Sequence, residues 1–144
     1  MHNWFECKIS YERVNEDGFQ KKVAEPYLVD ALSFTEAEAR IIEEMRPYIS
    51  SEFMVLDIKR ARYYETFLNE TGDKYYKVKV MLTLPDEKTG TEKRSSVQIL
   101  AQATSVLDAI GVIDNGMKGT LVDYEIAAIT ETPLMNVFPY HPKT

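Results

Sequence analysis

A chain of 144 residues with a hydrophobic fraction of 44% and a charged fraction of 28% has the composition of a soluble globular protein, and we expect residues 1–144 to form a single domain. No run of about 18 apolar residues is present, which excludes a membrane-spanning helix, and the N-terminus lacks the basic flank and apolar segment of a signal peptide. The net charge of −6 disfavours sequence-independent binding to nucleic acid, and a single cysteine excludes an internal disulfide. We therefore expect a cytoplasmic protein without membrane contacts.

The first half of the chain predicts two strands, a helix and a third strand. Residues 5–12 alternate apolar and polar side chains, and a second strand covers 21–31, where Pro26 predicts a bulge or a sheet edge. Ser33 and Glu36 form a capping box that begins a helix, and Pro47 ends it. The helix face expected to be buried carries Phe34, Ala37, Ile41 and Met45. A third strand is expected over 53–67.

The second half repeats this pattern. Strands are predicted over 74–84 and 94–103, followed by a helix over 104–115 with Ser105 and Asp108 as its capping pair. The buried stripe of this helix is expected to contain Val106, Ile110, Ile113 and Met117. A sixth strand covers 119–130, and residues 133–144 form an extended C-terminal tail that contains three prolines.

The order of these elements predicts an α+β fold of two similar ββαβ halves, mainly antiparallel sheet with two helices packed on one face. A shift of 71 residues aligns 4–67 with 75–138 without a gap, although identity between the halves is near chance. The match in element order suggests an internal duplication, and coincidence among common α+β patterns is the alternative.

The glycine-rich stretch "AIGVIDNGMKGTLVDYEI", residues 109–126, raises the question of a phosphate-binding loop. Such a loop needs G-x-x-x-x-G-K-[ST] between a strand and the start of a helix. Here Met117 displaces Lys118, and the stretch ends a helix instead of beginning one, so that carbonyls and not amides would face a phosphate. We interpret Asn115-Gly116 as a left-handed helix cap and Gly119 as a turn residue.

No other catalytic set stands out, and we expect no enzyme activity, no cofactor and no metal. His2 and His141 lie at opposite ends of the chain, which is a poor place to orient a general base. Cys7 shares the apolar parity of Phe5 and Ile9, so we expect a buried thiol and not a nucleophile. The acidic residues are expected to be solvated, among them Glu36, Glu38, Glu43, Glu44, Asp123 and Glu125.

Residues 58–98 carry nine Lys and Arg against six Asp and Glu, and they suggest a binding surface. If Tyr76, Val78, Val80 and Leu82 form the core face of their strand, the opposite face of the hairpin carries Tyr75, Lys77, Lys79 and Arg94. Rings beside cations on an open sheet are typical of single-stranded nucleic-acid binding, whereas outward Lys and Tyr are also ordinary in antiparallel sheets. Arg60, Arg62 and Tyr64 share one parity of the third strand, on a face that the sequence leaves open.

Apolar residues in the tail offer a second surface: Leu134, Met135, Val137, Phe138 and Tyr140. We expect the tail to pack on its own domain, and a contact across a dimer is the alternative.

Five stretches make the chain resemble a known family over nearly its whole length: "YLVDALSFTEAEARIIEEM", "IKRARYYETF", "YYKVKV", "EKRSSVQILAQA" and "MKGTLVDYEIAAITETPLMNVFPY". It resembles an uncharacterised family from gut Bacteroidota and from the phages and mobile elements of those bacteria. The resemblance implies a bacterial cytoplasmic or phage-encoded protein, and it carries over no functional residues.

The sequence thus favours a non-catalytic binding or interaction module that self-associates as a homo-oligomer. The first alternative is a single-stranded nucleic-acid-binding protein in phage or mobile-element DNA metabolism. The second is a small-molecule binder that uses the groove between the two halves.

Overall fold

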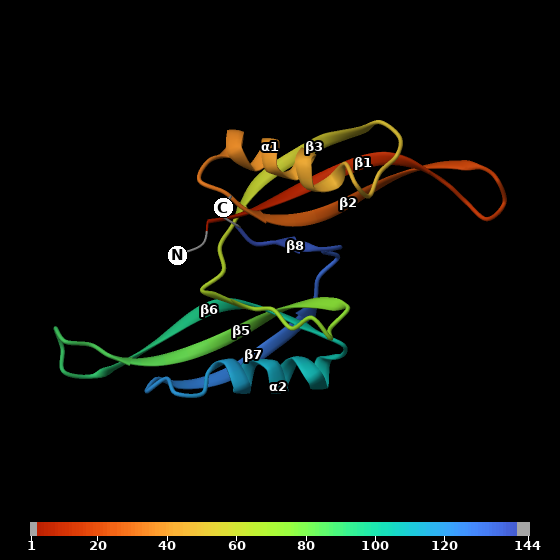
Figure 1. Cartoon of the computed structure of the whole chain (residues 1–144). Helices are drawn as coiled ribbons and strands as arrows, with labels where there is room; N and C mark the ends of the chain where they lie inside the picture. The colour runs from red at the N-terminus through yellow and green to blue at the C-terminus, as the bar shows by residue number, and fades with distance from the viewer. Residues whose placement is uncertain (1–2, 141–144) are drawn as a thin grey trace. The chain divides into compact units, whose positions relative to one another are not determined.

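The structure, a computed structural model, describes residues 3–140. Over these residues the chain forms eight strands and two helices in the order β1 β2 α1 β3 β4 β5 β6 α2 β7 β8 (Figure 1). The predicted α+β class with mainly antiparallel pairing is confirmed. The strands form two four-stranded sheets, and each sheet carries one helix.

The chain divides into two compact units. Unit 1 takes in the residues up to Arg62 together with those from Pro133 onward, and unit 2 takes in Tyr63–Thr132. The chain therefore leaves unit 1 once and returns to it at its C-terminal end.

Unit 1 contains a sheet in the order β3-β1-β2-β8. Strand β1 is antiparallel to both β2 and β3, and the short β8 is parallel to β2. The elements of this unit are β1 (Trp4–Val14), β2 (Gln20–Asp30), α1 (Phe34–Met45), β3 (Phe53–Ala61) and β8 (Val137–Phe138).

The core of unit 1 lies between one face of this sheet and α1. The helix contributes Ala37, Ile41 and Met45. The sheet contributes Phe5, Cys7 and Ile9 of β1, on the apolar parity that the sequence predicts, together with Tyr27 and Val29 of β2. Each large apolar side chain buried in this way stabilises the fold by about 1.5–3 kcal/mol, so this face holds the helix on the sheet.

Unit 2 contains a sheet in the order β4-β6-β5-β7. Its elements are β4 (Glu65–Phe67), β5 (Lys74–Pro85), β6 (Glu92–Ala103), α2 (Val106–Gly116) and β7 (Asp123–Glu131). The predicted core face of β5 is confirmed, because Tyr76, Val78, Val80 and Leu82 pack with Ala109 and Ile113 of α2.

The two units share one topology. Read from the opposite end, the order β7-β5-β6-β4 repeats β3-β1-β2-β8. The register of β1 against β3 shifts between Lys8 and Ile9, and the register of β5 against β7 shifts between Lys79 and Val80, 71 residues later. A bulge is a specific local feature, so its recurrence supports an internal duplication, which itself stays a prediction.

The prediction of one strand over 53–67 is wrong. Strand β3 of unit 1 ends at Ala61, whereas β4 belongs to unit 2 and pairs there in parallel with β6. Strand β8 mirrors this arrangement, since it follows β7 of unit 2 but pairs with β2 of unit 1. Each unit thus includes a short strand that follows the other unit's last long strand.

Both predicted helix caps are confirmed. The Ser33 side chain accepts a hydrogen bond from the Glu36 amide, and the Ser105 side chain accepts one from the Asp108 amide. The predicted buried faces need one correction at the same place in both helices. Phe34 is 52% exposed and Val106 is 50% exposed, and each is the first residue of its helix. The Phe34 ring still contacts the sheet, edge-on to Phe5 with 4.9 Å between the ring centroids. Ile110 is half-buried instead of buried.

Two backbone predictions are corrected in part. Pro26 lies in an unbroken ladder opposite Lys8, so no bulge forms there. It does lie at a sheet edge, since β8 pairs only with Leu28 and Val29. Gly116 ends α2 without a left-handed conformation, whereas Gly119 has a φ of 84° and is the predicted turn residue.

The C-terminal tail packs on unit 1 over its described part. Leu134, Val137 and Phe138 are buried, and the Phe138 ring stacks on Tyr27 with 6.1 Å between the ring centroids. Arg40 of α1 holds the same segment by donating to the Pro139 carbonyl over 3.2 Å.

Candidate functional site

The four residues of the predicted binding patch lie on one face of the unit 2 sheet. Tyr75, Lys77 and Lys79 alternate along β5, and Arg94 of β6 pairs with Thr83, which has the same parity. Lys77 and Lys79 are exposed, and neither forms an ion pair within the described residues.

The other two members contribute less to an open cationic surface. Tyr75 is only 6% exposed, so its ring is not available for stacking in this structure. The Arg94 guanidinium donates to the Glu125 carboxylate over 3.0 Å, which offsets its charge. The patch is reduced to a pair of free lysines.

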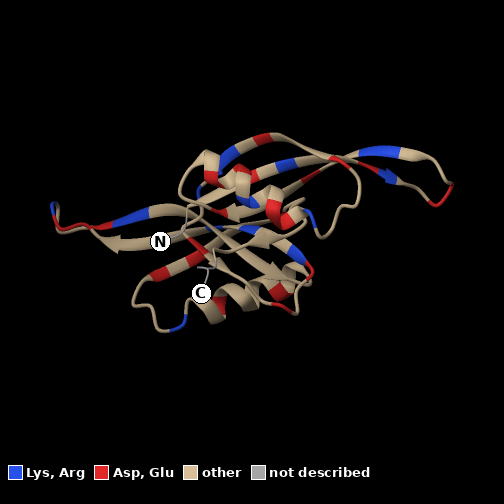
Figure 2. Ribbon diagram, turned by 45° about the horizontal axis from the view of Figure 1, so that its top comes forward, with Lys and Arg blue, Asp and Glu red and all other residues tan. Residues whose placement is uncertain are grey.

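The basic stretch 58–98 is also divided between the units. Lys59, Arg60 and Arg62 belong to unit 1, and unit 2 contains seven Lys and Arg against eleven Asp and Glu, a net charge of −4. Both signs of charge are interspersed along the strands (Figure 2). The positive field that nucleic acid needs is therefore weak around Lys77 and Lys79.

The structure shows on which face of the unit 1 sheet Arg60 lies. It pairs with Phe5 and lies on the α1 side of the sheet, with its guanidinium 5.7 Å from the Phe5 ring centroid. Tyr64 lies beyond the end of β3, and its amide donates to the Gln98 carbonyl of unit 2 over 2.7 Å. Arg60 and Tyr64 therefore do not form a common surface, although they share parity in the sequence.

The feature that the sequence did not reveal is the edge of the unit 1 sheet. Strand β3 is the last strand in its sheet order, so one side of its backbone has no partner strand within the described residues. Two of its large apolar side chains are exposed, Met54 by 62% and Leu56 by 48%.

A groove runs beside this edge between α1 and β3. It consists of two hollows of about 400 and 370 Å³ that share Val55. The apolar lining comes from both elements: Phe34 and Ile42 from α1, and Phe53, Met54, Val55, Leu56 and Ile58 from β3. The rest of the lining is polar: Thr35, Glu38, Arg46, Ser51, Glu52 and Asp57. An exposed apolar edge next to a groove of this mixed lining has the properties of a surface that binds an added strand.

The corresponding edge of unit 2 is different. Strand β7 is also an edge strand, but Asp123, Glu125 and Glu131 are all exposed along it. Like charges on an edge strand oppose pairing with a second copy. Leu56 is the extra residue of the β3 bulge, and the corresponding extra residue in β7 is Ala127.

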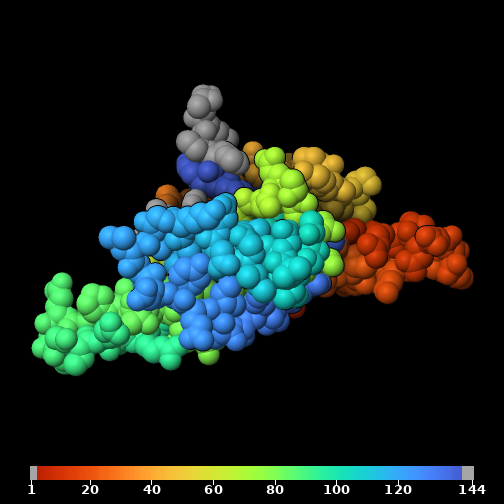
Figure 3. All heavy atoms as spheres, turned by 90° about the horizontal axis from the view of Figure 1, so that it is seen from below, coloured from red at the N-terminus to blue at the C-terminus, as the bar shows by residue number. Residues whose placement is uncertain are grey.

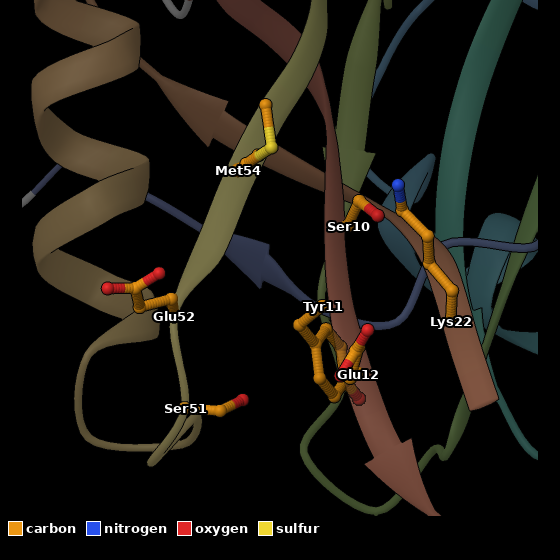
Figure 4. A pocket seen from close by; sticks show the side chains of 7 residues that line it. All are labelled: Ser10, Tyr11, Glu12, Lys22, Ser51, Glu52 and Met54. Atoms are coloured by element: carbon orange, nitrogen blue, oxygen red, sulfur yellow. The ribbon is translucent and has the colours of Figure 1, made fainter. Parts of the chain in front are cut away.

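A polar hollow of about 430 Å³ lies on unit 1 near the ends of β1, β2 and β3 (Figure 4). Ser10, Tyr11 and Glu12 come from β1, Lys22 comes from β2, and Met54 comes from β3. A hydrogen bond to the Glu25 carboxylate raises the pKa of the Tyr11 hydroxyl, which keeps this group protonated.

Cys7 is buried as predicted. Burial, and then the negative charges of Glu6 and Asp57, raise the pKa of its thiol to about 12. A thiol of this kind is almost entirely protonated at neutral pH and reacts slowly. His2 and His141 lie outside the described residues. Among residues 3–140, no three His, Cys, Asp or Glu side chains are close enough to hold a metal ion.

The described helices are too short or too polar to cross a membrane. No curated protein and no solved structure matches this chain. Residues 3–140 match the sequence profile of a family described as a domain of unknown function (DUF4494). Because this match covers nearly the whole chain, the protein belongs to that family.

Proposed function

We propose that the protein is a non-catalytic interaction module of a bacterium or phage, and that it self-associates through the open edge of β3. The observation that carries this proposal is the edge itself, where Met54 and Leu56 are exposed beside the α1–β3 groove. Because each of these side chains is already partly buried, removing the rest from water would contribute about 1–2 kcal/mol per residue, before the cost of association.

The charges along β3 favour a second copy as the partner. The N-terminal part of the strand is apolar and follows Glu52. The C-terminal part carries Arg60 and Lys59, which pairs with Glu6 over 3.3 Å, and it is followed by Arg62. Antiparallel pairing of two β3 strands would bring the acidic end of each beside the basic end of the other. Cross-strand pairs of opposite charge stabilise a sheet by about 0.2–1 kcal/mol each.

Light scattering during gel filtration tests the proposal. We expect the average mass to rise toward that of a dimer as the protein concentration rises from about 10 to 200 μM. Leu56→Lys should hold the mass at that of a monomer, because a charge would then lie in the apolar interface. Ala127→Lys places the same charge at the corresponding bulge of unit 2 and should leave the mass unchanged. A monomer at every concentration, or equal effects of the two variants, would contradict the proposal.

A second candidate function is binding of single-stranded nucleic acid, and it is favoured by the exposed, unpaired Lys77 and Lys79 on one sheet face. The net charge of unit 2 and the burial of Tyr75 weigh against it. Fluorescence anisotropy with an oligo(dT) of about 20 nucleotides tests it, because such binding must weaken steeply with salt.

The variant Lys77→Glu/Lys79→Glu should then abolish binding. The control Lys88→Glu/Lys93→Glu makes the same change in net charge elsewhere on the β5–β6 hairpin and should weaken binding only slightly. Absence of binding by the unmodified protein in low salt would eliminate this candidate.

A further inference from the structure

Unit 2 contains a small apolar recess where the segment that carries β4 meets the C-terminal end of α2. Its volume is about 170 Å³. The α2 face of unit 2 is shown in Figure 3, where the teal spheres of α2 lie between the blue segment that follows it and the yellow-green segment that carries β4. An apolar cavity of about 150 Å³ is sufficient to hold a benzene molecule, so this recess has room for one ring.

The lining of the recess has an apolar interior and a polar rim. Leu82 and Met117 are buried and form its floor, and Phe67 and Val122 are half-buried around them. Tyr64, Glu65 and Thr120 are exposed residues that complete the lining. A ligand would therefore bury an apolar group while it keeps a polar group near water.

The polar groups around the recess favour a positive charge. The Glu65 carboxylate can only accept hydrogen bonds when ionised, and none of the described lining residues is Lys, Arg or His. The last turn of α2, whose carbonyls point toward the C-terminal end of the helix, also contains no basic residue. The negative end of a helix dipole stabilises a cation placed near it.

Unit 1 has larger side chains at the positions that correspond to Gly116 and Leu82, so the shared topology does not require small residues at these two positions. Gly116 is eleven residues after its helix cap Ser105, and the residue eleven after Ser33 is Glu44. Leu82 pairs with Tyr124 as Tyr11 pairs with Phe53. At both positions unit 2 has the smaller side chain. The Phe67 ring occupies the space beside Gly116, whereas the smaller Leu82 lines the recess.

From this combination we infer that unit 2 binds a small organic amine, with an aromatic or short branched group in the recess and its ammonium group beside Glu65. The site lies within unit 2 and is independent of the β3 edge. Its occupant is a free small molecule of about ten non-hydrogen atoms, for which a dissociation constant of about 1 mM or lower is reasonable.

Titration of the full-length protein with benzylamine, followed by methyl NMR, tests this inference. We expect saturable shifts of the Leu82, Met117 and Val122 methyl signals. Benzyl alcohol should bind about fivefold more weakly, because it cannot form a charge-assisted hydrogen bond. Benzoate should not saturate, since Glu65 would repel it.

Two pairs of variants locate the site. Val122→Phe fills the recess and should abolish the saturable shifts of Leu82 and Met117, whereas Leu121→Phe, at the fully exposed neighbour, should preserve them. Glu65→Gln should remove the preference for benzylamine over benzyl alcohol, whereas Glu70→Gln, which lies outside the lining, should retain it. A thermal unfolding midpoint close to that of the unmodified protein establishes that each variant is folded.

Three results would overturn the inference: no saturable shift with benzylamine, equal affinity for benzylamine and benzyl alcohol, or undiminished binding by a folded Val122→Phe protein. If Val122→Phe does not fold, Thr120→Trp at the rim replaces it and should weaken benzylamine binding at least about tenfold, by steric exclusion. Undiminished binding by that variant would equally overturn the inference.

Discussion

Three glycines in the stretch 109–126 have three different backbone environments. Gly111 lies in the interior of α2, and a Cβ atom there would have no neighbour within 4 Å. A Cβ at Gly116 would lie 2.6–2.7 Å from ring carbons of Phe67. Gly119 has a φ of 84°, a conformation that favours glycine. The stretch is therefore explained by packing and turn geometry at the end of a helix.

Alanine substitutions distinguish the first two environments. Gly111→Ala should raise the free energy of unfolding by about 1 kcal/mol, because alanine is the better helix former. Gly116→Ala should give no gain or a loss of up to about 2 kcal/mol, since overpacking against Phe67 opposes the same helical preference. Urea unfolding measures both values, and an equal gain from the two substitutions would contradict the packing role of Gly116.

Two buried titratable groups predict how stability depends on pH. Burial raises the pKa of Cys7 from 9.0 to about 12 and the pKa of Tyr27 from 10.0 to about 12, with further contributions from neighbouring carboxylates. Both groups lose protons more readily in the unfolded chain, so the stability they contribute is full below about pH 9 and declines between about pH 9 and 12.

Urea unfolding at several pH values checks this direction. The free energy of unfolding should fall over the alkaline range, and it should fall less in Tyr27→Phe, which lacks one of the two groups. A variant whose stability declines as steeply as that of the unmodified protein would show that the Tyr27 hydroxyl does not titrate in this way.

At the scale of elements, the sequence predicts best what is determined locally. Ser33 and Ser105 begin their helices because their side chains satisfy nearby amides, and the alternation along β5 identifies its core face. The break between β3 and β4 could not be predicted in this way. Residues 53–67 carry β-branched or aromatic residues on both sides of the break, and only pairing with distant β6 determines that Glu65–Phe67 belongs to another sheet.

Arg40 connects α1 to two other segments of unit 1. Its side chain is 15% exposed, donates to the Asp30 and Pro139 carbonyls, and forms an ion pair with Glu44 over 3.4 Å. Its guanidinium also lies 5.6 Å from the Tyr140 ring centroid. These contacts fasten the helix to the end of β2 and to the C-terminal segment.

Arg40→Met should therefore lower the free energy of unfolding by about 1–3 kcal/mol, the usual cost of hydrogen bonds to a charged group. Arg46→Met is the control, because Arg46 is an exposed residue at the end of the same helix. Denaturant unfolding measures the free energy of unfolding of both variants. If Arg40→Met and Arg46→Met are equally stable, the connecting role of Arg40 is contradicted.

At the scale of the whole molecule, each unit contains one short strand that follows a long strand of the other unit in the sequence. Unit 1 obtains β8 from the C-terminal end of the chain, and unit 2 obtains β4 from the segment that follows β3. The sequence predicts two similar halves, but it does not show this exchange, because neither short strand has enough residues to give a periodic signal.

Removal of residues 133–144 should weaken unit 1 more than unit 2. Without β8, the edge of β2 at Leu28 and Val29 loses its partner, and Tyr27 loses its contact with Phe138. We expect faster amide hydrogen exchange in β2 and α1, and little change in β5 and α2. An equal increase in both units would show that the tail does not stabilise unit 1 specifically.

Several features of the candidate sites could not be predicted from the sequence. Side-chain parity places Tyr75, Lys77, Lys79 and Arg94 on one face, but it cannot reveal that Tyr75 is buried or that Arg94 pairs with Glu125. The β3 edge depends on strand order, which arises from long-range pairing. The exposed Met54 and Leu56 could have been identified only once that order was known.

Amide hydrogen exchange of β3 as a function of protein concentration tests the central claim, self-association through this edge, most directly. We predict that deuterium uptake by a peptide covering Phe53–Ala61 falls as the concentration rises, while uptake by a peptide covering Asp123–Glu131 stays constant. Uptake by β3 that does not change with concentration, or protection that rises equally in β7, would contradict the account.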